Sequence, residues 1–135
     1  MPIMEWDNSL DIGVESMNDE HKQILDLMNK IYDANEAGQS GIHINNLVGR
    51  LARVTIDHFR DEEKYMESIG YEGLGTHKII HQDLLKKYTA FADQIKAHDG
   101  QVPPEFLSFL KRWLTAHIRG VDIKYGQASN MKKAG

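Results

Sequence analysis

Polar side chains of types that can bind metal ions lie on predicted helix faces whose other members are apolar. The sequence places them at His21, His58, Glu62, His77, His81 and His117. A carboxylate buried without a cation or a proton carries a large desolvation cost, so Glu62 needs a positively charged partner. Imidazole and carboxylate donors suit iron, and they suit zinc and manganese as well. The residue types therefore predict a buried metal site and leave the metal open.

Two pairs of these residues have a spacing that suits coordination from one side of a helix. His58 and Glu62 are four residues apart, and so are His77 and His81. Four residues turn an α-helix through about 400°, so both members of a pair project from nearly the same side, one turn apart. Each pair can therefore offer two donors to one site.

A third pair, His117 and Asp122, has a spacing of five residues. An ideal α-helix does not align two residues at this spacing. Gly120 lies between them and is a poor helix former. We therefore expect the helix to loosen near Gly120 and to bring the Asp122 carboxylate inward as a seventh donor.

Four segments show the apolar spacing of three and four residues that is typical of amphipathic helices. We predict helices over residues 19–37 and 42–68, from the glycine-rich break at 70–75 to residue 97, and from Pro103 to about Gly120. Ser16 and Asp19 resemble a capping box at the start of the first helix. Four helices with short connections predict an all-α, up-down-up-down four-helix bundle.

The length of 135 residues fits a single domain, residues 1–135. We expect an N-terminal arm over residues 1–18, the bundle over about 19–120 and a short C-terminal tail over 121–135. The arm carries Trp6 and Ile12, and we expect it to pack along the bundle rather than to form a further core helix.

The topology of such a bundle provides an independent check on the donors. The first turns of helices one and three lie at the same end as the last turns of helices two and four. All seven predicted donors fall in those turns or near them, whereas His43 and His98 fall at the opposite end. Histidines scattered over the surface would not sort in this way.

Composition excludes several classes of function. The chain has no cysteine, so it has no disulfide, thiolate metal site or iron–sulfur cluster. A net charge of −4 gives no reason to expect nucleic acid as a partner. No apolar run is long enough to span a bilayer, and residues 1–6 lack the pattern of a signal peptide. We expect a cytoplasmic protein, and a monomer because no helix shows a second long apolar stripe.

The complete pattern of donors resembles the ligand set of the hemerythrin family. The matching residues are His21, His58 with Glu62, His77 with His81, and His117 with Asp122. The segments Trp6-Asp7, Gly13-Val14 and Asp19-Glu20-His21 are similar to the bacterial branch, the bacteriohemerythrins. The resemblance covers nearly the whole chain, and no expected ligand is missing.

The resemblance implies two iron ions, Fe2+ or Fe3+, with a bridging oxo or hydroxo group. One ion would be held by His77, His81 and His117, and the other by His21 and His58. Glu62 and Asp122 would bridge the two. The second ion would keep one open position, where O2 would bind end-on as a hydroperoxide. The implied function is reversible O2 binding for carriage, storage or delivery, with an oxygen-consuming enzyme as a candidate partner, and the implied protein is not an enzyme.

Apolar residues beside the donors match the O2 pocket of that family. These residues are Ile24, Phe59, Trp113, Leu114 and Ile118. A dry pocket is needed because water would allow the bound oxygen to be protonated further and lost. For Ile24 and Trp113, packing in the bundle core is the simpler explanation.

Several alternatives remain at this point. Any one of the histidines, taken alone, is more often a core or surface residue than a ligand. A di-iron oxidase or peroxidase typically uses E-x-x-H motifs, which this sequence lacks. A hydrolytic two-metal site would need an open substrate cleft. An O2 or redox sensor would have to act in trans on a separate output protein.

Overall fold

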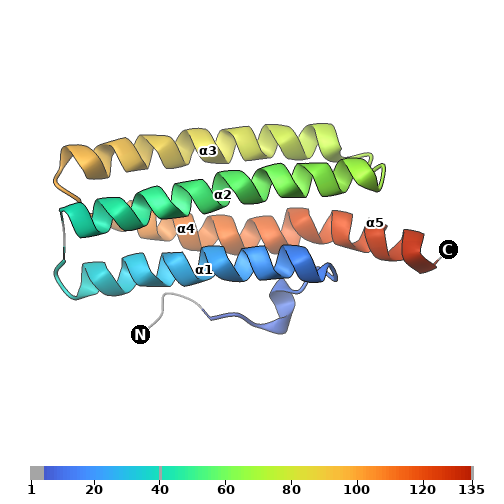
Figure 1. Cartoon of the computed structure of the whole chain (residues 1–135), viewed down its shortest axis with the longest axis horizontal. Coiled ribbons are helices and arrows are strands. Elements are labelled where there is room, and N and C mark those ends of the chain that lie inside the picture. The colour runs from blue at the N-terminus through green and yellow to red at the C-terminus, as the bar shows by residue number, and fades with distance from the viewer. Residues whose placement is uncertain (1–4, 40, 135) are drawn as a thin grey trace.

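In the part of the chain that the structure describes, four long helices run alternately up and down (Figure 1). The computed structural model describes residues 5–39 and 41–134, with side chains as far as residue 129. The helices are α1 (Glu15–Glu36), α2 (Ile42–Ser68), α3 (Leu74–Ala97) and α4 (Pro104–His117), which continues through η2 (Ile118–Asp122) into α5 (Ile123–Ala134). The all-α four-helix bundle predicted from the sequence is confirmed.

The apolar stripes of the helices face one another and form the core. Ile24, Met28 and Ile31 on α1 have no solvent exposure, and neither do Leu51 on α2 and Ile95 on α3. Fully burying one side chain of this size contributes about 1.5–3 kcal/mol. The stripes therefore fix which face of each helix turns inward, and with it the direction of every polar residue on that face.

The first helix begins one turn earlier than predicted, at Glu15 rather than near Asp19. Ser16 lies inside the helix, and the N-cap residue Val14 makes no side-chain capping hydrogen bond. The predicted capping box is therefore wrong. Met17 is only 5% exposed and lies one turn before His21, so it extends the buried stripe backwards.

The predicted short tail over residues 121–135 is also wrong, because its described part is helical. After η2 the chain continues as α5 to Ala134. Tyr125 has no solvent exposure and Ser129 is 1% exposed, so one face of α5 belongs to the protein interior. Packing of this face against the end of the bundle keeps the helix going beyond Gly120.

The turn between α4 and α5 is a π-helix over Ile118–Asp122. A π-helix has hydrogen bonds between residues five apart, so His117 and Asp122 project to the same side. The predicted loosening of the helix is confirmed. Gly120 has no positive φ, and a Cβ atom added to it would meet nothing within 4 Å. Neither backbone conformation nor close packing therefore requires glycine there.

The described part of the N-terminal arm, residues 5–14, packs against the bundle, as expected, with a short 3-10 helix, η1 (Asn8–Leu10), beside the start of α1 (Figure 1). Leu10 and Ile12 are buried, at 0% and 2% exposure. The carbonyl oxygen of Ile12 lies so close to Gly126 that a Cβ atom on Gly126 would be 2.0 Å from it. Glycine at 126 therefore allows the arm to cross α5.

Replacing Gly126 by alanine should destabilise the protein, because the added methyl group meets backbone that cannot rotate away. We expect Gly126→Ala to lower the free energy of unfolding by about 1–3 kcal/mol, the usual cost of overpacking. Gly120→Ala is the matched control on the same continuous helix, and it should be neutral or slightly stabilising. Urea denaturation followed by circular dichroism measures both. Equal stability of the two variants would show that the arm does not depend on this close approach.

Candidate metal centre

The seven predicted donors meet at one end of the bundle, and all are buried. Each of the four bundle helices contributes at least one of them, and the π-turn after α4 contributes Asp122. Their exposures range from 0% for the two carboxylates to 7% for the most exposed histidine. The donors are His21, His58, Glu62, His77, His81, His117 and Asp122. The sequence therefore identified a set of residues that the fold brings together.

The donors form two clusters that share both carboxylates. The first contains the three-histidine group, which is His77, His81 and His117. The second contains the two-histidine group, which is His21 and His58. Glu62 and Asp122 belong to both clusters, and within each cluster one ligand atom of every residue lies within 4.8 Å of the others. Each cluster has the size of a site for one metal ion.

The two oxygens of Glu62 are divided between the two histidine groups. Oε2 lies 3.4 Å from Nε2 of His21 and 3.0 Å from Nε2 of His58. Oε1 lies 3.2 Å from Nε2 of His77 and 2.8 Å from Nε2 of His81. The carboxylate therefore spans the two clusters, with one oxygen in each.

Asp122 is divided in the same way. Its Oδ2 lies 3.1 Å from Nε2 of His21. Its Oδ1 lies 3.0 Å from Nε2 of His77 and 2.9 Å from Nε2 of His117. Two carboxylates that each connect the same two groups of imidazoles form a double bridge between two positions.

Most of these donor atoms have no hydrogen-bond partner, although they lie close together. Nε2 of His21, His77, His81 and His117, Oε1 of Glu62 and both oxygens of Asp122 are buried and have no hydrogen-bond partner. Buried polar atoms without a partner are rare in folded proteins because each carries a desolvation cost. Donor atoms that lie close together without hydrogen-bond geometry fit cations placed between them. The residues present therefore fit a pair of metal ions.

Outer contacts orient one histidine in each group. Nδ1 of His58 lies 2.7 Å from Glu20 Oε1, and Nδ1 of His81 lies 2.9 Å from Glu63 Oε2. In metal sites, such carboxylates fix the orientation of the imidazole and make it a stronger donor. Both glutamates are partly exposed, at 23% and 28%, so they form the outer edge of the centre.

A buried tyrosine holds the bridging carboxylate of α2. The Tyr125 hydroxyl donates a hydrogen bond of 2.8 Å to Glu62 Oε2. Sequence reasoning did not assign roles to Tyr125, Glu20 or Glu63. The available signal was position, because Tyr125 follows Asp122 by one helical turn and each glutamate adjoins a predicted ligand. Using that signal for Tyr125 required a helix that continues past Gly120.

The electrostatics of the site couple the histidines to the carboxylates. Burial acts to lower the pKa of His58, but Glu62 and Glu20 raise it to about 10. Burial acts in the same way on His77, and Asp122 and Glu62 raise its pKa to about 9. Burial acts to raise the pKa values of Glu62 and Asp122, yet the histidines hold both below their usual range. The donor set therefore attracts positive charge, supplied by protons or by metal ions.

The five predicted pocket residues all lie in the interior. They are Ile24, Phe59, Trp113, Leu114 and Ile118, with exposures between 0% and 6%. The Phe59 ring stacks on His81 with centroids 3.8 Å apart and contacts Trp113 edge-on at 6.0 Å. Phe59 thus forms an apolar wall directly against a donor.

Fold and site together define a four-helix-bundle protein with a buried donor set that could hold metal ions. The chain belongs to the hemerythrin family, because the family model described as "Hemerythrin HHE cation binding domain" matches residues 12–128. The predicted membership, with bacteriohemerythrins among the relatives, is confirmed. Within the described residues, the helices are too short or too polar to cross a membrane.

Relatives match along most of their length. The chain is 28% identical to a bacteriohemerythrin of Stenotrophomonas maltophilia, covering 93% of this chain and 80% of the relative. It is 31% identical to a myohemerythrin of Theromyzon tessulatum, covering 90% and 89%. Among solved structures, wild-type hemerythrin superposes with a TM-score of 0.82 at 28% identity, covering 93% of this chain and 96% of that one.

The raised and lowered pKa values predict how the stability of the metal-free protein depends on pH. His58 and His77 stabilise the fold fully below their ordinary pKa of 6.5, and this contribution is lost as the pH rises through about 9 to 10. Glu62 and Asp122 contribute above their ordinary values of 4.5 and 3.8, and this contribution is lost as the pH falls. The metal-free protein should therefore be most stable between about pH 4.5 and 6.5.

Thermal unfolding at constant ionic strength, followed by circular dichroism, measures this profile. Added Zn2+ serves as the control, because a metal ion displaces the protons and should flatten the loss of stability toward pH 10. A metal-free protein whose stability stays constant or rises between pH 6.5 and 10 would contradict the charge coupling.

Proposed function

We propose that this chain binds O2 reversibly at a pair of iron ions. The proposed ligands are His21, His58, Glu62, His77, His81, His117 and Asp122. The observation that carries the proposal is the division of both buried carboxylates between the two histidine groups. A pair of ions that shares two bridges is what this arrangement accommodates, and the chain belongs to a family described as cation binding.

The two positions differ in the number of donors that the protein offers. The three-histidine group and the two carboxylates supply five donors, whereas the two-histidine group and the same carboxylates supply four. The position beside His21 and His58 is therefore the more open one, and we assign the end-on binding of O2 to it. When bound, the iron pair supplies the electrons that hold O2 reversibly. We propose iron rather than zinc or manganese because the relatives are named bacteriohemerythrin and myohemerythrin.

Apolar side chains keep water away from this position. We assign that role to Ile24, Phe59, Trp113, Leu114 and Ile118, which are all buried. A dry surrounding strengthens electrostatic interactions inside the site and limits the delivery of protons. The Tyr125 hydroxyl donates a hydrogen bond to the bridging Glu62. Burial and the charge of Glu62 raise the Tyr125 pKa, so this group stays protonated.

The composition of the donor set favours a carrier over an oxidase. Five imidazoles accompany two carboxylates, whereas di-iron enzymes on bundles typically use four glutamates and two histidines. A sensor that acts in trans would use the same site, and a separate output protein would distinguish it. The monomeric state, the cytoplasmic location and an oxygen-consuming partner enzyme stay predictions.

The proposal is tested by an optical oxygen titration. Protein loaded with Fe2+ under argon should be colourless, develop a charge-transfer band in air, and lose that band when argon returns. His43→Ala, which changes an exposed histidine at the opposite end of the bundle, should behave identically. Irreversible oxidation on the first exposure, with turnover of an added substrate, would instead support an oxidase, and an absence of any band would overturn O2 binding.

The variant Leu114→Ala tests separately whether the apolar residues keep water out of the site. Removing a side chain that is 2% exposed opens space beside the site, so we expect water to enter and autoxidation of the oxygenated form to be faster, by roughly tenfold for each 1.4 kcal/mol of lost protection. Leu110→Ala is the matched control, because Leu110 is equally buried one turn earlier on α4. The decay of the oxygenated band measures both. Equal lifetimes in the two variants would remove the lining role from Leu114.

A further inference from the structure

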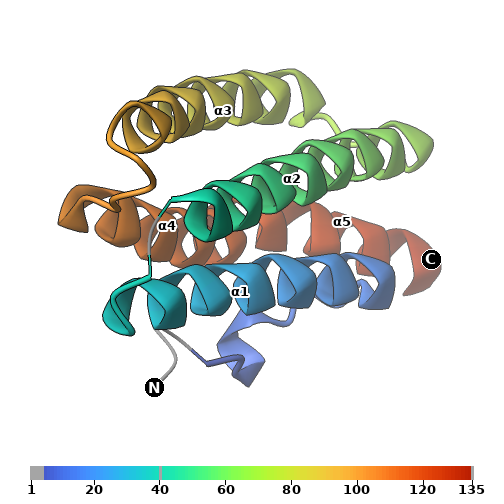
Figure 2. The same ribbon diagram turned by 60° about the vertical axis from the view of Figure 1, so that its left-hand side comes forward.

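The four helices do not pack with equal closeness. Close approaches join α1 to α2 and α2 to α3, whereas α3 and α4 stay farther apart (Figure 2). Aromatic rings fill the space between α3 and α4. The ring centroid of Phe91 on α3 lies 5.5 Å from that of Phe106 and 5.4 Å from that of Phe109, both on α4. Rings of this size hold the helix axes apart and leave the seam open at the surface.

A groove of about 670 Å³ runs along this seam. Its walls include Leu84 and Phe91 from α3 and Phe109 and Trp113 from α4. Small-molecule sites commonly have volumes of about 300–1,000 Å³ and mainly apolar walls. The groove has the size and the surface of such a site.

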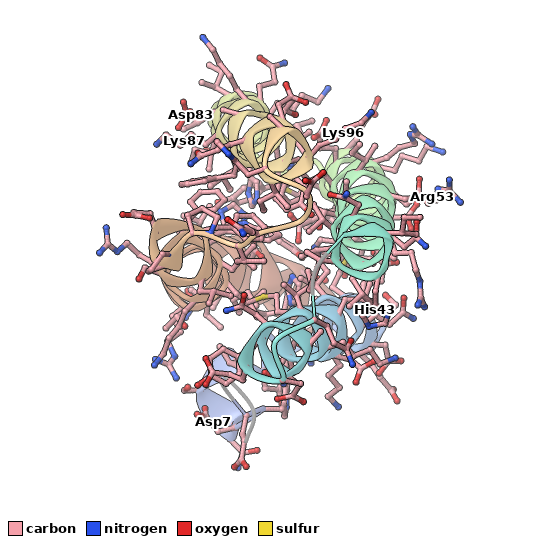
Figure 3. All side chains as sticks on the ribbon, turned by 90° about the vertical axis from the view of Figure 1, so that its left-hand side faces the viewer. Asp7, His43, Arg53, Asp83, Lys87 and Lys96 are labelled. Atoms are coloured by element: carbon pink, nitrogen blue, oxygen red, sulfur yellow. The ribbon has the colours of Figure 1, made fainter. Side chains whose placement is uncertain are left out.

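Positive charge stands on both sides of the groove. Lys87 lines it from α3 and Arg112 lines it from α4. Lys87 is 59% exposed and forms an ion pair of 3.0 Å with Asp83, and Figure 3 shows both side chains on the same flank of α3. The lining carboxylate, Glu105, lies seven residues before Arg112 on α4, about 10 Å along the helix. The middle of the groove is therefore suited to an anionic group.

The net charges of the helices also favour an anion on this side of the protein. The α3 segment carries four lysines against two aspartates, whereas α1 carries six acidic residues against two lysines. The protein is acidic overall, with a net charge of −4, yet its apolar groove lies on the side with a positive excess. Such asymmetry attracts an anion to this side of the protein.

We propose that the α3–α4 groove binds a medium-chain fatty acid. Its carboxylate would lie between Lys87 and Arg112, and its chain would cover Leu84, Phe109 and Trp113. An alkyl chain needs no hydrogen-bond partners, and besides its charged residues the groove offers few polar groups, such as the hydroxyl of Ser108. A flavin or nucleotide would bring many polar atoms that this wall leaves unpaired, at a desolvation cost.

The proposed site adjoins the metal centre without sharing its function. One end of the groove reaches His117, the most exposed of the seven donors at 7%. A chain lying over Trp113 and His117 would stand between solvent and this side of the centre. Binding requires neither iron nor O2, so a failure of this proposal would leave the proposed function untouched.

Titration of the full chain with decanoate, below its micelle concentration, tests the proposal. Calorimetry should give one saturable site, and the fluorescence of Trp113 should change with it in a Trp6→Phe background, since the chain has two tryptophans. Replacing Lys87 and Arg112 together by glutamine should weaken binding roughly three- to tenfold, as expected for two exposed charges. Lys111→Gln is the control, because Lys111 neighbours Arg112 and lies outside the groove.

A substitution that fills the groove gives a second, independent test. Ser108→Trp places a large ring in the groove, far from the metal donors, and should abolish decanoate binding with helix content unchanged. The proposal fails if no saturable binding occurs, or if Lys111→Gln weakens it as much as the double variant does. It also fails if flavin mononucleotide occupies the groove more tightly than decanoate, or if sedimentation shows that the groove is covered by a second copy.

Discussion

Two carboxylates without solvent exposure, Glu62 and Asp122, lie within 4.8 Å of each other inside an otherwise apolar bundle. Like charges at this separation repel strongly in a medium of low dielectric constant, and each has lost its hydration. Positive charge between and around them is therefore a condition for the fold, and five imidazoles are placed to share it. Because each carboxylate faces both histidine groups, the two proposed metal positions would share both carboxylates. The rest of the structure serves to bring these seven side chains to one end of the bundle.

The helices meet this condition through their register and through one departure from α-helical geometry. Spacings of four residues align the donors of α2 and of α3, and the up-down-up-down path returns them to the same end. The π-turn at Ile118–Asp122 aligns a spacing of five and delivers the second carboxylate. The same turn leads into α5, whose Tyr125 hydroxyl donates to Glu62. A local irregularity thus supplies both one shared carboxylate and the hydroxyl that donates a hydrogen bond to the other.

Much of the fold and of the donor set could be predicted from the sequence because both depend on the helical spacing of residues. The helices from Ile42 to Ser68 and up to Ala97 follow from apolar spacing, and the donors follow from polar residues on those stripes. What was missed depends on tertiary contacts. After Gly120 the inward face consists of residues such as Tyr125 and Ser129, which do not form an apolar stripe, so the helix was read as a tail. Glu20 and Glu63 each adjoin a predicted ligand in the sequence, but their contacts with His58 and His81 depend on how neighbouring helices are placed. The open α3–α4 seam follows from ring packing, which spacing does not encode.

The double bridge is tested most directly by titrating metal-free protein with Fe2+ under anaerobic conditions, beside the variants Glu62→Gln and Asp122→Asn. If each carboxylate serves both positions, the unmodified chain takes up two ions together, and either variant loses affinity for both. A chain that binds a single ion, or a variant that retains one ion with unchanged affinity, would contradict the shared bridges.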